Sequence, residues 1–156
     1  MDKSAIVSAL IEDLRRRYDR AVSALSGARE AATGADTKAE NKYDTRGLEA
    51  SYLAAGQAEQ ADELLRAIHA VESFDFRAFE LDDPIATGAL VETEQDGELR
   101  HYLLAPAGGG IVLTSEDGDE ITVLGPASPL AARLIGKSSG AILSEQEPEV
   151  IVLEVF

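Results

Sequence analysis

Two carboxylates stand out in the polar stretch GADTKAENKY at residues 34–43. Asp36 and Glu40 are four residues apart, so a helical conformation would place both side chains on one face. Carboxylate oxygens in such an arrangement are suitable ligands for a hard cation such as Mg²⁺. The same stretch also has a structural interpretation, because Thr37 and Glu40 have the spacing of a capping box that satisfies free backbone N–H groups. The residues alone leave both interpretations open.

The polar stretch lies between two long segments that have helical periodicity. In the first segment apolar residues recur at alternating steps of four and three, which is typical of helices packed lengthwise on one another. They are Val7, Ile11, Leu14, Tyr18, Ala21, Leu25, Ala28 and Ala32. We expect Gly34 to end this helix in the left-handed conformation.

The second helical segment covers about residues 43–71, and its apolar seam is made mostly of alanine. The predicted seam consists of Ala50, Ala54, Ala58, Ala61, Leu65 and Ile68. The short link between the two segments predicts that they run antiparallel.

After Pro84 the apolar period changes to two. The candidate strands are IATGALV, RHYLLA, GIVL, EITVL, GAIL and EVIVLEV, with turns at 108–110 and 116–120. The stretch PLAARLIG predicts one short helix, with Pro129 at its first position and Gly136 at its end.

These patterns predict an α+β chain with three parts. An antiparallel coiled-coil hairpin covers residues 1–73 and has an acidic tip. A linker covers 74–84, where Phe74, Phe76 and Phe79 are expected to plug the junction, and a small antiparallel β domain with one short helix covers 85–156.

Composition narrows the classes of function. The chain has 156 residues, a net charge of −15 and no cysteine, so it has no disulfide framework and no thiolate metal site. It also lacks a run of 18 apolar residues, and we expect a cytoplasmic protein that does not span a membrane. The negative charge repels free nucleic acid and anionic lipid and favours a basic protein surface as partner. The only histidines, His69 and His101, lie in different halves without metal-site spacing.

The stretch GPASPLAARLIGKSSGAIL at 125–143 resembles the C-terminal domain of the Gre family of bacterial transcription elongation factors. That family shows Ser-Pro-(apolar)-Ala, followed by an apolar pair and Gly-Lys. The matching residues here are Ser128, Pro129, Leu130 and Ala131, then Leu134, Ile135, Gly136 and Lys137. A helical hairpin, a linker and a small β domain follow in the family's order, so the resemblance covers essentially the whole chain.

The resemblance implies an FKBP-like topology for the β domain and bacterial RNA polymerase as partner. In the family the C-terminal domain grips the rim of the polymerase's secondary channel, which assigns partner binding here to Ser128, Pro129 and Leu130. The coiled coil enters that channel, and the tip carboxylates Asp36 and Glu40 would help to hold a Mg²⁺ shared with the polymerase. The polymerase then cleaves its own backtracked RNA. The chain would thus be a monomeric accessory factor and not an enzyme. It would have no cofactor of its own, and would meet nascent RNA or DNA only inside the polymerase complex.

The tip departs from the family pattern Gly-Asp-x-Ser-Glu-Asn-x-Glu-Tyr. Asp36 and Tyr43 keep the family spacing, but the glutamate is displaced by one residue, and Lys38 and Lys42 replace a serine and a glutamate. Two ammonium groups reduce the local attraction for Mg²⁺. The alternative is therefore a Gre-family regulator that occupies the channel without stimulating cleavage.

Two other classes of function are also weighed. A prolyl isomerase needs an aromatic-lined pocket, and from residue 85 onward the only aromatics are Tyr102 and Phe156, so this class is rejected. A coiled-coil chaperone or oligomerising module would need an exposed apolar stripe at the hairpin tip, whereas GADTKAENKY is polar.

Overall fold

The computed structural model describes residues 1–34, 45–80, 82–143 and 149–156. They form two compact units: a sheet unit, Met1–Glu12 with His69–Phe156, and a hairpin unit, Asp13–Ile68. The expected parts at 1–73, 74–84 and 85–156 differ from these units at both ends of the hairpin, because residues 1–12 and 69–73 belong with the sheet. Within the described residues, no helix is both long and apolar enough to cross a membrane.

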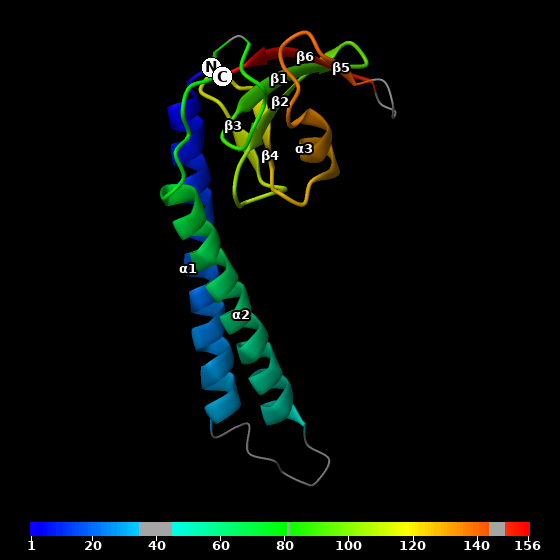
Figure 1. The fold of residues 1–156 in the computed structure, drawn as a ribbon. Coiled ribbons are helices and arrows are strands. Elements are labelled where there is room, and N and C mark those ends of the chain that lie inside the picture. The colour runs from blue at the N-terminus through cyan, green and yellow to red at the C-terminus, as the bar shows by residue number, and fades with distance from the viewer. Residues whose placement is uncertain (35–44, 81, 144–148) are drawn as a thin grey trace. The chain divides into compact units, whose positions relative to one another are not determined.

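Two long helices form the predicted antiparallel hairpin (Figure 1). Helix α1 is Lys3–Thr33 and helix α2 is Arg46–Glu72. On α1, the predicted seam is confirmed from Leu14 onward. Its buried members are Leu14, Ala21 and Ala28, and its half-buried members are Tyr18, Leu25 and Ala32.

The α2 seam is confirmed except at Leu65. Ala61 and Ile68 are buried, and Ala50, Ala54 and Ala58 are half-buried. Leu65 is 37% exposed, and the half-buried Leu64 takes its place. The prediction of Leu65 was wrong because the heptad step after Ala61 is three residues and not four.

The ends of α1 differ from expectation in two details. Ile6 and Leu10 are the fully buried residues here, while the predicted Val7 and Ile11 are half-buried, because the first turns of α1 pack within the sheet unit. At the other end, the Gly34 amide donates to the carbonyl of Glu30 at 2.8 Å, and Gly34 is not among the glycines with positive φ. The expected left-handed cap at Gly34 is therefore wrong.

All six predicted β-rich runs contribute a strand to one sheet with the order β3-β4-β2-β1-β6-β5. The strands are β1 Leu90–Gln95, β2 Glu98–Leu104, β3 Val112–Thr114, β4 Glu120–Leu124, β5 Ile142–Leu143 and β6 Val150–Val155. Among the described strands only the β2–β4 pair is parallel, so the predicted mostly antiparallel sheet is confirmed. The first strand begins at Leu90, later than the predicted run IATGALV.

A two-residue turn joins β1 to β2 and fixes their register, in which Gln95 faces Glu98. Asp96 and Gly97 have φ values of 54° and 80°. Positive φ at both central residues is typical of the type I′ turn that closes a twisted hairpin, and Asp-Gly is one of its preferred sequences.

Each face of the sheet carries buried apolar side chains. One face contributes to a core cluster with the short helix α3, Pro129–Leu134; the cluster includes Val91, Tyr102, Leu104, Leu124, Ala131, Leu134, Val150, Val152 and Val155. Alternation along the strands places the fully buried Leu90, Leu103, Ile121 and Val123 on the opposite face. A sheet buried on both faces provides a rigid support for the loops at its ends.

The segment that was expected to link two domains packs within the sheet unit. The rings of Phe74 and Phe76 meet edge to face with centroids 5.0 Å apart, and Phe79 packs against the core cluster. The Nζ of Lys3 donates to the carbonyls of Gly88 at 3.2 Å and Phe156 at 2.9 Å, and also to that of Arg77. These bonds connect the first turn of α1 to three separate segments of the sheet unit.

Candidate protein-docking site

Ser128 and Pro129 start helix α3, and both have a structural role there. Ser128 is the N-cap residue, with extended backbone angles of φ −70° and ψ 124°. Its Oγ accepts a hydrogen bond from the amide of Ala131 at 3.3 Å. Pro129 follows at the first helical position, where a missing N–H leaves no bond unmade. The predicted start of this helix is therefore confirmed.

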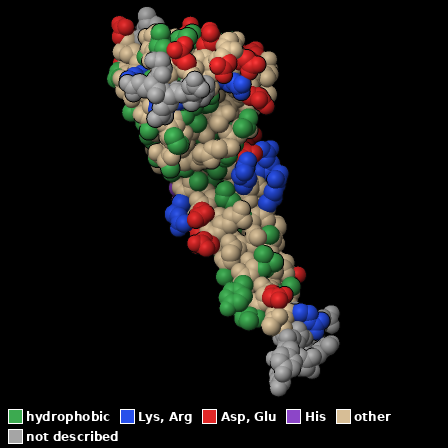
Figure 2. Space-filling model, turned by 90° about the vertical axis from the view of Figure 1, so that its right-hand side faces the viewer, with side chains coloured by type: hydrophobic (Ala, Val, Ile, Leu, Met, Phe, Trp, Pro, Cys, Tyr) green, Lys and Arg blue, Asp and Glu red, His purple; other side chains and the backbone are tan. Residues whose placement is uncertain are grey.

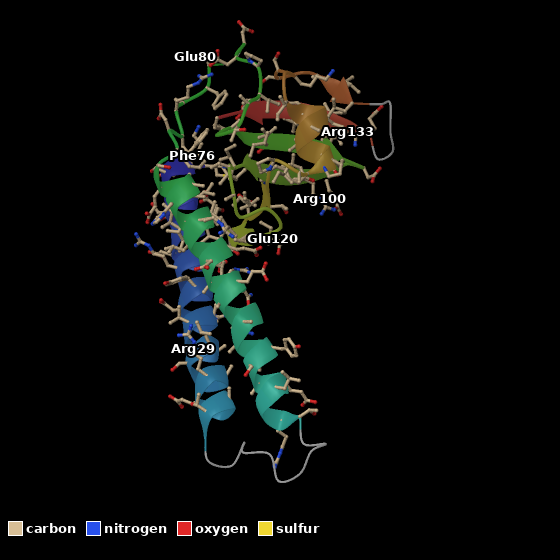
Figure 3. The ribbon with its side chains drawn as sticks, turned by 60° about the horizontal axis from the view of Figure 1, so that its bottom comes forward. Arg29, Phe76, Glu80, Arg100, Glu120 and Arg133 are labelled. Atoms are coloured by element: carbon tan, nitrogen blue, oxygen red, sulfur yellow. The ribbon has the colours of Figure 1, made fainter. Side chains whose placement is uncertain are left out.

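Gly136 supplies the stop of α3. It has a φ of 81°, a left-handed conformation that glycine adopts without strain, and its amide donates to the carbonyl of Ile85 at 2.8 Å. The Arg133 side chain of α3, labelled in Figure 3, donates to the carbonyl of Leu143 in β5 at 3.1 Å. The short helix is thus fixed to β5 and to the segment before β1, which positions the loop in front of it.

The three residues assigned to partner binding differ in how much surface they offer. Pro129 is exposed and Ser128 is half-buried, whereas Leu130 packs against the core cluster. A protein partner that meets this end of α3 would therefore reach Pro129 first, and Leu130 mainly supports the helix from below.

A groove of about 480 Å³ lies directly beside Ser128. Its lining is formed by two loops and the end of β4: Gly109, Gly110, Thr122, Val123, Leu124, Gly125, Pro126, Ala127 and Ser128. The two loops approach closely, because a Cβ added to Gly109 would lie 2.9 Å from the backbone nitrogen of Gly125. Backbone hydrogen bonds from Gly110 to Val123 and from Val123 to Ile111, both 2.8 Å, hold the glycine loop against β4.

The groove carries no charge among its lining residues, all of which the structure describes. Glycine, proline and alanine expose backbone and small apolar groups, which can contact a partner by shape and by hydrogen bonds to carbonyl oxygens. Such a lining suits the docking of a protein segment and provides no acid, base or nucleophile for chemistry. From the sequence alone, the glycines at 108–110 are predicted only to form a turn, since nothing in their spacing shows that they meet Gly125.

Among the described residues of the sheet unit, the titratable side chains form no metal site. His101 in β2 is 7% exposed, and its Nε2 lies 3.0 Å from the Glu92 carboxylate on the neighbouring strand β1. Throughout the described ranges, no group of three or more His, Asp or Glu residues could hold a metal ion. The His101–Glu92 pair therefore serves as a cross-strand contact within the sheet.

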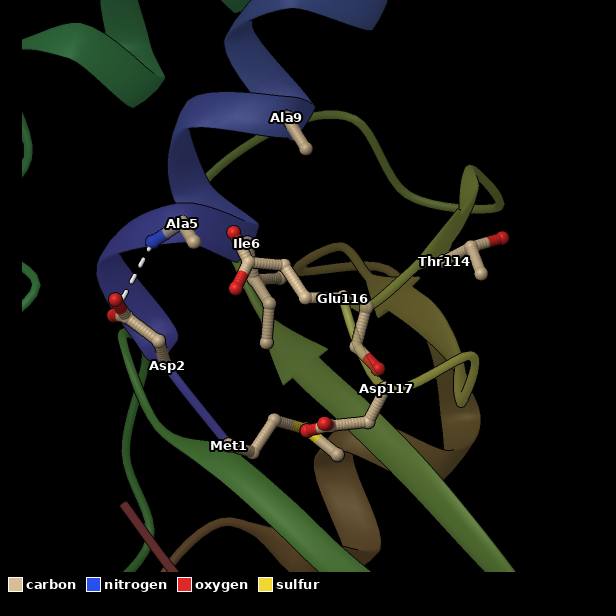
Figure 4. Close-up of a pocket in the computed structure, with 9 residues that line it drawn as sticks. Met1, Asp2, Ala5, Ile6, Ala9, Thr114, Glu116 and Asp117 are labelled. Atoms are coloured by element: carbon tan, nitrogen blue, oxygen red, sulfur yellow. Dashed lines mark hydrogen bonds between the residues drawn. The ribbon is translucent and has the colours of Figure 1, made fainter.

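A further pocket of about 330 Å³ lies between the start of α1 and the turn from β3 to β4 (Figure 4). Asp2 at its edge caps α1 by accepting hydrogen bonds from the amides of Ser4 at 2.8 Å and Ala5 at 3.3 Å. The hydrogen bond from the Ser4 hydroxyl, together with these amides, lowers the pKa of the Asp2 carboxyl. The Asp2 carboxylate is thus engaged in capping helix α1.

The carboxylates Asp36 and Glu40, assigned to the hairpin tip and to a shared Mg²⁺, lie outside the described residues, as does Thr37 of the proposed capping box. Their assigned roles stay predictions. In the sequence, these residues lie between the end of α1 at Thr33 and the start of α2 at Arg46.

Comparisons with known proteins find similar solved structures only. No protein-family model and no curated protein matches the chain. A crystal structure of GreA factor homolog 1 (Gfh1) of Thermus thermophilus is 22% identical, with a TM-score of 0.35 and coverage of 95% of each chain. A structure of the transcription factor Gfh1 is 22% identical, with a TM-score of 0.38, over 94% of this chain and 93% of that chain. Thermus aquaticus Gfh1 is 21% identical, with a TM-score of 0.36, over 95% and 94%.

Proposed function

We propose that this protein is a Gre-like transcription elongation factor that binds bacterial RNA polymerase. The sheet unit would dock on the polymerase through Ser128, Pro129 and the uncharged groove beside them, with Leu130 as support. The observation that carries the proposal is the coincidence of the Gre-like motif at 125–143 with an exposed loop that borders an open groove.

The helical hairpin would enter the secondary channel of the polymerase. Asp36 and Glu40 would then supply carboxylate oxygens to a Mg²⁺ in the polymerase active site. In that site a water molecule is added across one phosphodiester bond of the backtracked RNA, and a short RNA fragment is released. The chain would act as an accessory factor, because the groups that carry out hydrolysis belong to the polymerase.

A regulator that occupies the channel without stimulating cleavage is the second candidate. It is favoured by Lys38 and Lys42, whose positive charges oppose Mg²⁺ binding beside the two carboxylates. Both candidates share the docking site on the sheet unit and differ only at the hairpin tip.

A transcript-cleavage assay on a stalled, backtracked elongation complex separates the two candidates. An elongation factor shortens the RNA in the presence of Mg²⁺, whereas a regulator binds and leaves the RNA intact. If the wild-type protein neither binds the complex nor alters its RNA, the proposed function is wrong.

Two variants of Ser128 test the docking site without confusing binding with folding. Ser128→Asp keeps a good N-cap for α3 but places a negative charge at the groove, so we expect normal thermal stability and weaker polymerase binding. Ser128→Ala keeps the groove uncharged but loses the cap, so we expect a loss of about 1 kcal/mol in stability and nearly normal binding. Equal binding by Ser128→Asp and wild type would remove this residue from the docking site.

A further inference from the structure

Strand β3 is the last strand of the sheet on one side, so among the described residues only β4 pairs with it. On the β4 side, the carbonyl of Ile111, just before the strand, accepts a hydrogen bond from the amide of Val123 at 2.8 Å. Residues that bond to one neighbour alternate along an antiparallel strand. The backbone N–H and C=O groups of Val112 and Thr114 therefore point away from β4, toward the open edge of the sheet.

This open edge lacks the features that commonly keep strands from pairing. Natural proteins protect exposed edges with lysine, proline or a β-bulge. The residues of β3 are Val-Leu-Thr, and their register with β4 is continuous from Val112 to Thr114. The Val112 side chain is apolar and 56% exposed. An added strand would thus gain main-chain hydrogen bonds and an apolar contact here.

The pocket of Figure 4 lies at the end of the same edge, because Thr114 and the turn after it form one of its walls. The other wall is the start of α1, which is apolar at Ala5 and Ile6. Glu116 and Asp117 extend from the turn toward α1 (Figure 4). A lysine or arginine side chain suits this combination, since its aliphatic stem would lie on the apolar wall while its charged end reaches the carboxylates.

The charge around β3 selects a basic occupant. Residues 102–132 contain no lysine, arginine or histidine and four acidic side chains, Glu116, Asp117, Asp119 and Glu120. The ion pairs among the described residues involve none of these four. Figure 2 shows that acidic side chains also gather on the visible face of the sheet unit. Nucleic acid and a second copy of this acidic chain would be repelled, whereas a basic polypeptide segment would be attracted.

We propose that the open edge of β3 binds an extended, basic segment of a partner protein as an added strand. One lysine or arginine of that segment would occupy the pocket beside Glu116 and Asp117. The inference goes beyond the proposed function and does not depend on it, because this pocket and the groove beside Ser128 share no lining residue.

Binding of fluorescent probe peptides to the full chain, measured by anisotropy, tests the mode of recognition. The probe is acetyl-Val-Lys-Val-Lys-Val-Lys-Val-amide, in which valine and lysine would point to opposite faces of a strand. A copy with N-methyl groups on its central residues keeps the charge but cannot pair as a strand, and we expect it to bind at least about 10-fold more weakly. A copy with glutamate in place of lysine should not bind. Equal binding by the probe and its N-methylated copy would overturn the inference, because charge alone would then explain the attraction.

Glu116→Gln with Asp117→Asn tests the pocket. The matched control, Asp62→Asn with Glu63→Gln, removes the same charges from exposed positions of α2. Thermal melts check that both variants stay folded. We expect the pocket variant to bind the probe about 3- to 10-fold more weakly than wild type, and the control to bind nearly as well as wild type. The same weakening in both variants would contradict a specific role for the pocket.

Hydrogen exchange locates the bound peptide on the full chain. The amides of Val112 and Thr114 face the open edge, so we expect saturating probe to slow their exchange at least about 10-fold. The amide of Leu113 already pairs with β4 and serves as the internal reference. Unchanged exchange at Val112 and Thr114 would overturn the inference. Protection of these amides at high protein concentration without peptide would also overturn it, because a second copy of the chain would then occupy the edge.

Discussion

Gly109 and Gly125 lie backbone against backbone, so that a Cβ on Gly109 would come 2.9 Å from the amide nitrogen and 3.1 Å from the Cα of Gly125. Neither residue has a positive φ, so space and not backbone strain requires glycine at these positions. This contact joins the loop at 108–110 to the loop that leads to Ser128, and it forms one wall of the candidate docking groove.

Gly109→Ala is therefore expected to destabilise the sheet unit by about 1–3 kcal/mol through overpacking. Gly125→Ala should have a smaller effect, because its Cβ would meet Gly109 at a nearest distance of 3.3 Å. Urea unfolding measures both. Gly56→Ala in α2 is the control: its Cβ would meet nothing within 4 Å, and alanine favours the helix. Equal stability of wild type and Gly109→Ala would mean that the two loops are farther apart than described.

Lys3→Met should destabilise the sheet unit, because the carbonyls of Arg77, Gly88 and Phe156 would lose a shared donor. The expected loss is about 1–3 kcal/mol in the free energy of unfolding. Burial is the main reason why the pKa of Lys3 is lowered, which agrees with a partly enclosed ammonium group. Lys137→Met is the matched control, since the Lys137 side chain is exposed on the loop after α3. The same loss in both variants would point to a general effect of charge removal.

Asp13→Asn should weaken the hairpin unit in a pH-dependent manner. Burial raises the pKa of the Asp13 carboxyl, but the hydrogen bonds from Arg17 and Arg16 outweigh it and lower the pKa below the usual 3.8. Because the folded pKa is depressed, this stabilisation is present above pH 3.8 and is lost as the pH falls through the lower folded value. We expect wild type to exceed the variant by about 0.5–1 kcal/mol at pH 7, and this difference to shrink as the pH falls below 3.8. A difference that persists unchanged at low pH would contradict this origin.

Asp36→Asn together with Glu40→Gln should abolish stimulation of RNA cleavage while polymerase binding persists. The physical reason is that the proposed polymerase-docking site lies in the sheet unit, whereas the carboxylates lie at the proposed tip of the hairpin. Each single change should raise the Mg²⁺ concentration that half-maximal cleavage requires. Melting of the isolated variants gives the control, because loss of a helix cap alone would reduce stability by about 1 kcal/mol. Full cleavage activity in the double variant would exclude both carboxylates from metal binding.

Much of the fold follows from local periodicity in the sequence. The two helices, the six β-rich runs and the punctuation of α3 by Pro129 and Gly136 are all predicted correctly, because each depends on neighbours within one or two turns. The Asp96-Gly97 pair is a further local signal, because Asp-Gly is a preferred sequence for the turn that joins β1 to β2. By contrast, the burial of Ile6 and Leu10 depends on packing against distant parts of the chain, which heptad spacing cannot reveal.

The candidate sites also combine features that local sequence predicts with features that depend on the fold. The cap formed by Ser128 could be predicted from the Ser-Pro spacing, but the groove beside it requires the glycine loop and β4 to meet in space. On the hairpin, the polar stretch at 34–43 argued against an exposed apolar stripe at the tip. The described residues that follow it in α2 nevertheless include the exposed Leu48, Tyr52 and Leu53, because the alanine seam of α2 turns other faces of the helix to solvent.

The most direct test of the central claim is the equilibrium binding of the full chain to purified bacterial RNA polymerase, with Ser128→Asp as the comparison. The account predicts saturable binding with a dissociation constant of about 1 µM or tighter for wild type, and a clear loss of affinity for the folded Ser128→Asp variant. The absence of wild-type binding at a concentration of about 100 µM would contradict it.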